Sequence, residues 1–405
     1  MNRFFHSRSG VAGLVLLGLL GLVGAFGPLL APYPEAASHW RDISYWQDSP
    51  AAVPPAWTRG PWNSSRVAAS ARVSGGSPEE SAMEGGASKL TWRFSLNPLG
   101  TTTGRDLVLV LPGEGQLPVL VGVKALDGNE HELARKILRV SGAEPARLSF
   151  PAVVGRELVV TEYKVPGSPP PESPLLILPG QVSGLMGTDV AKRDIFTGIV
   201  LGIRWALLLG VLVSFITVMT GIILAIGAAC TGGWVDLLIN RIYEFFSLMP
   251  ILPFLIVLSA VFKPSLWTFA ALALLFFWTK AFKPVYAMAL QIREEGYIEA
   301  GKSIGTSRWY RAFKYVLPAL LPYGFSIMAL SVPGIILYEA GISILGLGDS
   351  TVVTWGQMLH DAFAQGAVIN RLWWWILPPG LMISITGIAF SLLGRGLERV
   401  WDPRG

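Results

Sequence analysis

Long uncharged runs of apolar residues recur along the chain and predict helices that span a membrane. A helix needs roughly 20 apolar residues to cross the hydrocarbon core of a bilayer. Runs of that order occupy residues 11–30, 206–229, 245–262, 316–338 and 372–394. A sixth run, 266–279, is shorter, but it reaches Leu290 if the Lys280 and Lys283 amines extend toward the interface. The pattern therefore predicts six spans, and prolines inside them predict kinks: Pro250, Pro253, Pro378 and Pro379.

The segment between residues 32 and 187 lacks such runs and has shorter patterns. Its first part, 34–88, is rich in Pro, Gly, Ser and Trp. Further on, five stretches alternate apolar and polar residues as strands do: 90–96, 107–111, 118–125, 137–140 and 157–163. Turn signals such as Asp127-Gly128 separate them, and a proline-rich stretch, 166–174, follows. We therefore expect a small β-rich domain, with a sandwich as one arrangement. Because it has no catalytic spacing, a packing collar is favoured over a domain with its own ligand.

Lysine and arginine in the short loops predict the orientation in the membrane. Arg3 and Arg8 precede the first span and place the N-terminus in the cytoplasm. The loop at 280–314 carries seven basic residues against three glutamates, whereas 341–371 carries a single arginine. The tail 395–405 is again basic. Both termini and the basic loop are therefore expected in the cytoplasm, and the β-rich segment is expected outside.

The first run also fits a cleaved signal peptide by its position and basic start. Its apolar stretch is longer than the usual signal-peptide core, and Gly27-Pro28 interrupts the approach to a cleavage site. These two features favour a retained span. Cleavage would leave five spans, and it would still place the insertion outside and the tail inside.

The composition supports a bilayer protein. Hydrophobic residues make up 52% of the 405 residues and charged residues only 15%, where a soluble domain carries about a quarter. The net charge of +5 comes without a basic stripe that interleaves aromatics, so no nucleic-acid partner is predicted. Cys230 is the only cysteine and the four histidines lack ligand spacing, which excludes an intramolecular disulfide and predicts no metal site.

The basic loop contains a pattern typical of two short helices joined at a glycine. Residues 294–305 predict a helix that stops at Gly305, because glycine takes the left-handed conformation that a tight corner needs. After Thr306-Ser307 a second short helix, 307–314, is expected, and Pro318 marks the return to the membrane. A short amphipathic helix in the cytoplasm suits docking to a partner protein. Its basic and aromatic residues are Arg308, Trp309, Tyr310, Arg311, Phe313 and Lys314.

This loop resembles the EAA loop of ABC importer permeases. The resemblance rests on Glu299-Ala300-Gly301, on Gly305 six residues after the glutamate, and on the Leu317-Pro318 ending. The third residue of the motif is usually alanine, so Gly301 is a mild departure. In that family the loop forms the coupling helix that docks into a cleft on the ATPase subunit.

Further segments resemble the dipeptide, oligopeptide and nickel permeases in particular. Gly187-Thr188-Asp189 with Arg193-Asp194 resembles the signature GTDxxGRD, with Lys192 in place of its glycine. Residues 339–348 resemble EAxLSFLGLG. The other matching segments are 31–33, 355–359, 393–397 and 402–404. Several matches in the right order are far more specific than the loose EAA pattern alone, and they are those of the C-type of the two permeases in such systems.

The resemblance covers residues 11–33 and 187–405. It implies an all-α polytopic membrane protein with about six transmembrane helices in the type I ABC importer permease fold. The β-rich segment is then an extracytoplasmic insertion, much longer than the family's usual outer segment, which leaves the substrate and the outer partner open. The expected parts are 1–32 (tail and first span), 33–186 (insertion) and 187–405 (permease core), with the coupling loop at 291–315.

The resemblance also assigns roles to individual residues. Contact with the ATPase is expected at Glu299, Ala300, Gly301, Ser303, Gly305, Thr306, Ser307, Arg308, Trp309 and Arg311. A second set is interpreted as scaffolding of the gate: Gly187, Thr188, Asp189, Arg193, Asp194 and Glu339. Asp189, Arg193 and Asp194 are expected to pair with one another, and Glu339 to cap or anchor the end of its helix. No catalytic residue is predicted.

The chain lacks the pattern G-x-x-x-x-G-K-[ST]. ATP and Mg²⁺ are therefore expected in a separate ATPase, with no cofactor and no enzymatic activity in this chain. The family implies a second permease subunit, one or two ABC ATPases and an extracytoplasmic solute-binding protein, assembled in the lipid of a bacterial inner membrane. A secondary transporter is disfavoured, because no internal repeat is visible and the spans are nearly free of charge. A membrane-anchored sensor would leave the pattern at 299–318 unexplained.

Overall fold

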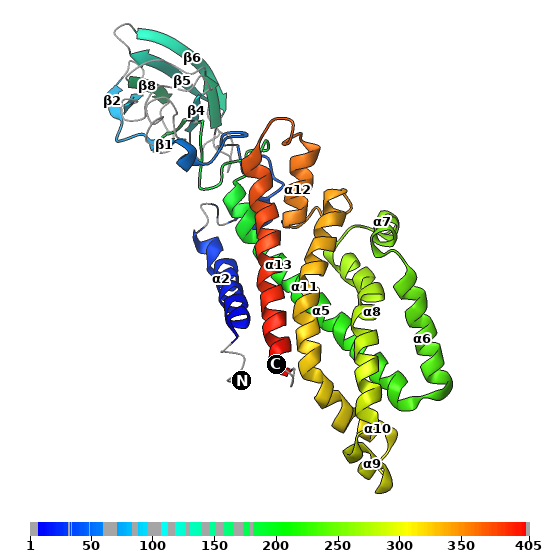
Figure 1. Ribbon diagram of the computed structural model, residues 1–405. Coiled ribbons are helices and arrows are strands. Elements are labelled where there is room, and N and C mark those ends of the chain that lie inside the picture. The colour runs from blue at the N-terminus through cyan, green and yellow to red at the C-terminus, as the bar shows by residue number, and fades with distance from the viewer. Residues whose placement is uncertain are drawn as a thin grey trace. The chain divides into compact units, whose positions relative to one another are not determined.

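The structure is a computed structural model, shown in Figure 1. It describes residues 7–30, 33, 35–47, 49–59, 71–82, 88–95, 107–111, 118–126, 130–139, 146–150, 157–164, 173–178 and 181–401. The chain forms two compact units, Met1–His39 with Thr197–Gly405, and Trp40–Phe196. The boundaries expected at 32/33 and 186/187 stay predictions. Most of the 31–33 turn, the turn signals between the strands, most of 166–174 and the tail at 402–404 lie outside the described residues.

The first unit is helical. Among the described residues, five helices are long and apolar enough to cross a membrane, and a bent pair makes up to six spans, which agrees with the expected number. The long helices are α2 (Arg8–Leu30), α5 (Ile195–Thr231), α8 (Leu266–Arg293), α11 (Leu317–Ile344) and α13 (Trp373–Trp401). The shorter ones are α3 (Ala36–His39), α6 (Gly233–Leu248), α7 (Ile251–Val261), α9 (Gly296–Ser303), α10 (Arg308–Arg311) and α12 (Trp355–Ala364).

One expected span is not a single helix. The run at 245–262 is divided between α6 and α7, which meet at 85° (Figure 1). Met249 at the junction is extended, with φ −74° and ψ 131°, because the ring of Pro250 disfavours the helical conformation in the residue before it. Pro253 lies in the first turn of α7, where its missing N–H removes no helix hydrogen bond. In contrast, α13 continues through Pro378 and Pro379.

Close approach of backbones positions α2 against its neighbours. A side chain on Gly13 would lie 2.5 Å from the Leu393 amide nitrogen of α13, and one on Gly24 would lie 2.8 Å from Ile203 of α5. Arg204 of α5 donates from Nε to the Gly24 carbonyl at 2.7 Å. Small residues at helix contacts of this kind are typical of membrane bundles.

The second unit is a β-sandwich, as the alternating stretches suggested. Its strands are β1 (Ala71–Ser74), β2 (Glu79–Ala82), β3 (Ser88–Ser95), β4 (Leu107–Leu111), β5 (Pro118–Leu126), β6 (Glu130–Arg139), β7 (Ala146–Phe150), β8 (Glu157–Lys164) and β9 (Leu175–Leu178). One sheet has the order β1-β9-β4-β7 and the other β2-β3-β8-β5-β6, with every pairing antiparallel. Alternate residues of both sheets, such as Trp92 of β3 and Leu109 of β4, share one buried core.

The strand expectations differ from the structure in two respects. The strand expected at 137–140 is longer in the structure, where it begins at Glu130. Its first part was not predicted, because the sequence EHELARK is too polar to suggest a strand. Four short strands were not expected, namely β1, β2, β7 and β9. Each has only four or five residues, too few for an alternating pattern to emerge.

Substitution of Trp92 tests whether the sandwich core is stable independently of the helical unit. Its side chain is 1% exposed, and its indole N–H has no hydrogen-bond partner among the described residues. Trp92→Ala is expected to destabilise the sandwich by about 3–5 kcal/mol, whereas Trp92→Phe removes the unpaired donor, keeps a buried ring and destabilises less. Limited proteolysis of the detergent-solubilised protein should show faster cleavage within the insertion and unchanged cleavage of the helical unit. Equal loss of protection in both units would contradict a separate core.

Candidate functional site

The expected corner in the basic loop is present and is built around Gly305. Helix α9 ends at Ser303, Ile304 is its C-cap, and Gly305 follows with φ +83°. The Gly305 amide donates to the Lys302 carbonyl at 3.0 Å, and the Thr306 amide donates to the Gly301 carbonyl at 3.1 Å. This pair of bonds is the Schellman arrangement, which ends a helix with a left-handed residue.

Side chains fasten the corner to the helix that follows. Ser307 caps α10 by accepting from the Tyr310 amide at 3.1 Å. The Thr306 hydroxyl donates to the Gly301 carbonyl at 2.7 Å, and the Arg311 guanidinium donates to the Thr306 carbonyl. A π-helical turn, η3 (Ala312–Val316), then leads into α11. A methyl group on Gly301 would lie 3.3 Å from Thr306 Oγ1, so the alanine usual in the EAA motif would need only a small adjustment.

The exposed surface of the corner is apolar and basic. Ile304 is 79% exposed and Trp309 is 59% exposed, and the Trp309 ring stacks on Phe313 with 6.0 Å between centroids. Large exposed apolar side chains in one place are typical of a docking surface. Among the expected ATPase contacts, Gly301 is buried, Thr306 and Arg311 are half-buried, and the others are exposed: Glu299, Ala300, Ser303, Gly305, Ser307, Arg308 and Trp309.

Two arginines join the corner to the end of α5. Arg293 at the end of α8 donates to the Ala229 carbonyl at 2.9 Å, and Arg308 at the start of α10 donates to the Thr231 carbonyl at 3.3 Å. The last carbonyls of a helix lack partners within the helix and carry partial negative charge, so cationic donors are favourable there. Arg308 therefore bonds the corner to the 37-residue helix α5, and Arg293 bonds the end of α8 to it.

A second site lies around Glu339 of α11. The carboxylate is 8% exposed, and its Oε1 accepts from the Ser343 and Thr354 hydroxyls, each at 2.9 Å. Thr354 also caps α12, since its Oγ1 accepts from the Gln357 amide at 3.1 Å. A carboxylate is stabilised near a helix N-terminus, where the free amides carry partial positive charge. Glu339 therefore holds the start of α12 against α11.

Close packing locks α12 in place around this carboxylate. A side chain on Gly356 would lie 2.6 Å from the Ala340 Cα atom and 3.2 Å from Glu339 Oε2. The Trp355 indole donates to the Ile199 carbonyl of α5 at 3.1 Å. Helix α12 is therefore fixed to both α11 and α5.

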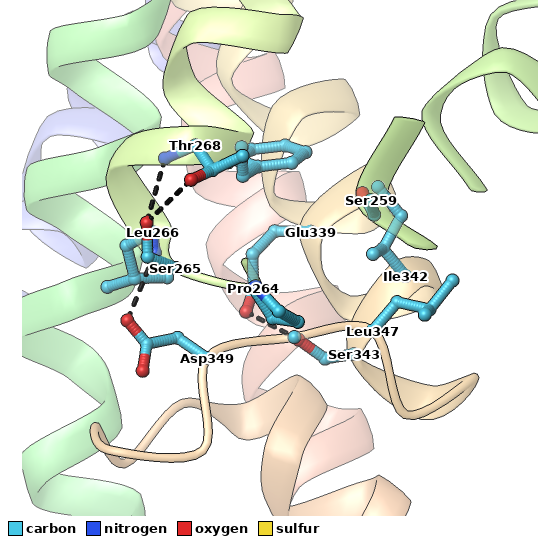
Figure 2. Close-up of a pocket in the computed structure, with 12 residues that line it drawn as sticks. Ser259, Pro264, Ser265, Leu266, Thr268, Glu339, Ile342, Ser343, Leu347 and Asp349 are labelled. Atoms are coloured by element: carbon cyan, nitrogen blue, oxygen red, sulfur yellow. Dashed lines mark hydrogen bonds between the residues drawn. The ribbon is translucent and has the colours of Figure 1, made fainter. Parts of the chain in front are cut away.

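The loop after α11 connects this cluster to the start of α8. Gly346 has φ +81° and ends α11 as Gly305 ends α9, with the Leu347 amide donating to the Ile342 carbonyl at 3.1 Å. Asp349 Oδ2 accepts from the Leu266 amide at 3.1 Å. Figure 2 shows the small pocket that results, lined by groups from α8, from α11 and from this loop.

The third group of expected residues, 187–194, belongs to the unit Trp40–Phe196. Arg193 Nε lies 2.6 Å from Asp189 Oδ2, and the Arg193 amide donates to Asp189 Oδ1 at 2.8 Å. Both side chains are buried, and the guanidinium lies 5.1 Å from the centre of the Trp40 ring. Thr188 pairs with Asp194 in a β-bridge, and Gly187 has φ +76°. The pairing expected between Asp189 and Arg193 is therefore present.

Lys192 stands where the signature GTDxxGRD has glycine, and its backbone explains that preference. Its φ is +67°, and its ammonium donates to the Gln47 carbonyl at 2.9 Å. Lys192→Gly should leave the free energy of unfolding within about 0.5 kcal/mol, because relief of the left-handed strain offsets the lost bond and the gain in unfolded-state entropy. Lys192→Val should destabilise by about 1–2 kcal/mol, since a β-branched residue is poorly tolerated there. Thermal unfolding of the two variants measures this, and equal effects would contradict a backbone origin.

Comparison with known proteins decides the family. The family described as binding-protein-dependent transport system inner membrane component matches residues 217–404, and the N-terminal TM domain of oligopeptide transport permease C matches residues 1–51. The dipeptide transport system permease protein DppC of Bacillus subtilis (strain 168) is 32% identical over 228 residues, covering 56% of this chain and 71% of the relative. The chain belongs to the dipeptide and oligopeptide ABC permease family.

Two further relatives match this chain with similar identity and coverage. The oligopeptide transport system permease protein OppC of Haemophilus influenzae is 30% identical, covering 54% of this chain and 70% of the relative. The probable D,D-dipeptide transport system permease protein DdpC of Escherichia coli (strain K12) is 30% identical, covering 56% of this chain and 76% of the relative. The resemblance expected from the sequence is therefore confirmed. This permease is a multi-pass inner-membrane protein.

Sequence reasoning missed most of the partners of Glu339. Thr354 and Gln357 together form the pattern of a capping box, a Thr followed three residues later by Gln, and this signal was available in the sequence. The contacts of Trp355 with Ile199 and of Gly356 with Ala340 join segments far apart in the chain, and no local pattern announces them.

Proposed function

We propose that this permease carries peptides inward across a bacterial inner membrane, driven by ATP hydrolysis in a partner subunit. The observation that carries the proposal is the corner at Gly305, which exposes Ile304 and Trp309 and is bonded through Arg293 and Arg308 to α5. The peptide substrate is inferred from the relatives, whose names describe dipeptide and oligopeptide permeases.

The mechanism follows from how the corner is connected. Closure of the ATPase around ATP and Mg²⁺ pushes the corner, and the two arginines pass the displacement to the C-terminal end of α5. At the other end of α5, the Ile199 carbonyl holds Trp355 of α12, which Glu339 fixes to α11. A tilt of α5 therefore acts on the cluster that holds α12, which we assign to the outer gate.

The proposal includes the assembly and its orientation. A second permease completes the pathway, one or two ABC ATPases bind the corner, and an extracytoplasmic solute-binding protein delivers the peptide. This chain contributes no nucleotide chemistry and no cofactor. The basic residues of 293–314 support a cytoplasmic corner, with both termini on the same side and the sandwich outside.

Purification and labelling test this function. The full-length permease, expressed together with its neighbouring transport subunits, should retain an ABC ATPase in stoichiometric amount and should support ATP-dependent peptide uptake in proteoliposomes. The variant Ser303→Cys in a Cys230→Ser background should react with a membrane-impermeant maleimide in inside-out vesicles and not in right-side-out vesicles. Labelling from the outside, or purification without any ATPase, would overturn the proposal.

A further inference from the structure

Lys280 is an intramembrane cation with an unusual environment. It lies in the middle of α8, about 21 Å from Leu266 and about 20 Å from Arg293 at 1.5 Å per residue. Its ammonium nitrogen is 4.7 Å from the centre of the Phe277 ring and 5.4 Å from that of Tyr338 on α11. Within the described part of the chain it has no carboxylate partner. Lysines within membrane spans are rare, and they usually line a pathway or meet a partner.

The Lys280 side chain points back along α8. The run at 266–279 does continue past Lys280 as expected, since α8 reaches Arg293. However, the ammonium lies over Phe277, one turn back toward Leu266. Lys280 is exposed on α8, and its ammonium lies beside two aromatic rings, which attract a cation without neutralising it.

Two other basic residues of the long helices have polar partners. Arg204 donates to the Gly24 and Ala25 carbonyls at 2.7 and 3.3 Å. Lys283, one turn after Lys280, lies 3.5 Å from Asn240 Oδ1. Lys283 also lies over the rings of Tyr243 and Tyr286, each at 5.5 Å. Lys280 differs from both residues because the contacts given for its ammonium are to rings alone.

Two prolines add backbone acceptors beside this cation. Pro284 has no N–H to donate to the Lys280 carbonyl four residues earlier, and Pro333 of α11 has none for Ala329. Next to Pro333, Gly334 leaves space, since a side chain there would meet only the Lys280 ammonium, at 3.7 Å. Carbonyls freed at membrane depth are tolerated where they are buried in protein or line a water-filled cavity. The Lys280 ammonium and a carbonyl without its usual helix donor therefore belong to one residue, and Gly334 adds no side chain against the ammonium.

We propose that Lys280, with Phe277, Tyr338 and Gly334, is a binding station for the carboxylate of the solute on its way through the permease. The ammonium pairs with the carboxylate, and the Lys280 carbonyl accepts an amide N–H from the same molecule, so the site suits the C-terminal end of a peptide. This inference rests on the proposed function and adds the group that the permease itself recognises. Tyr338 directly precedes Glu339 in α11, so the station and the residue that holds α12 are on the same helix.

Uptake of matched peptides tests the station. The full complex in proteoliposomes, with its solute-binding protein, is supplied with a tripeptide or its C-terminal amide at concentrations that saturate that protein. Lys280→Met should lower uptake of the free acid about tenfold and leave the amide within twofold of the wild-type rate, because only the acid loses a charge-assisted bond. Lys280→Arg should restore the acid. Lys283→Met is the matched control and should not discriminate between the two peptides.

A second measurement does not depend on the binding protein. In the detergent-solubilised complex, the free-acid peptide should slow modification of Lys280 by an amine-reactive reagent at least threefold, and the amide should not. An equal effect of Lys280→Met on both peptides would assign Lys280 to packing or to an acidic residue of the other permease and would overturn the station, as would unchanged uptake of both together with no protection. A wild-type complex that transports neither peptide would refute the proposed function, while the protection experiment still decides the role of Lys280.

Discussion

Gly305→Val is expected to reduce peptide-stimulated ATP hydrolysis by the reconstituted complex at least tenfold while membrane insertion stays normal. Position 305 has φ +83°, where an L-residue is disfavoured by about 1–2 kcal/mol and a β-branched residue by more. Valine would therefore move the backbone and break the bonds from the Gly305 and Thr306 amides that set the direction of α10. The exposed Trp309 and Ile304 would then no longer present one surface to the ATPase.

Two substitutions serve as controls for this result. Gly305→Asn should retain most of the coupling, because asparagine tolerates the left-handed conformation. Gly296→Ala, at the start of α9, changes a glycine of the same loop that has open space and no positive φ, and it should be neutral. ATPase activity with and without loaded binding protein separates coupling from basal hydrolysis. Equal coupling in the valine variant and the wild type would remove the corner from the mechanism.

Glu339→Ala is expected to lower the stability of the helical unit by about 2–5 kcal/mol and to reduce transport below a tenth of the wild-type rate. The substitution leaves the Ser343 and Thr354 hydroxyls without their common acceptor in a buried setting. A buried donor without a partner is unfavourable by about 1–3 kcal/mol. The start of α12 would also lose its connection to α11. Thermal unfolding of the purified permease and peptide uptake measure the two effects.

Glu339→Gln is the matched control for the hydrogen bonds. Its amide oxygen occupies the place of Oε1 and can accept from both hydroxyls, so stability should fall by less than about 1.5 kcal/mol and transport should largely survive. A glutamine variant as impaired as the alanine variant would mean that the negative charge, rather than the acceptor, holds α12 in place.

The sequence was most informative where a feature depends on local chemistry. Long apolar runs identify the helices, and Gly305 marks the corner because glycine readily takes the left-handed conformation that ends α9 there. The same local reasoning identifies Pro250 as a point of bending, although the 85° break is larger than a kink within one span. Short strands such as β9 escape such reasoning, because four apolar residues are compatible with several structures.

The parts that were not predictable arise from contacts between distant segments. The motifs at 339–348 and 355–359 each resembled a family pattern, but neither shows that Thr354 shares its hydroxyl between Glu339 and the Gln357 amide. Lys280 could be placed on a helix from the sequence. Its position over Phe277 and Tyr338 depends on how α8 packs against α11. The hydrophobic pattern of either helix alone does not predict that packing.

The pairing of β1 with β9 has a consequence for how such a permease acquires an extra domain. The first and last strands of the sandwich are antiparallel neighbours, with Ala71 opposite Leu178. The chain therefore enters and leaves the folded body at positions about 5 Å apart, the spacing of paired strands. Because the two ends of such a domain are held together by its own fold, inserting it into a surface loop costs the surrounding protein little chain entropy. Insertion at a single point thus allows an ancestral transporter to gain more than a hundred residues without redesign of its helices.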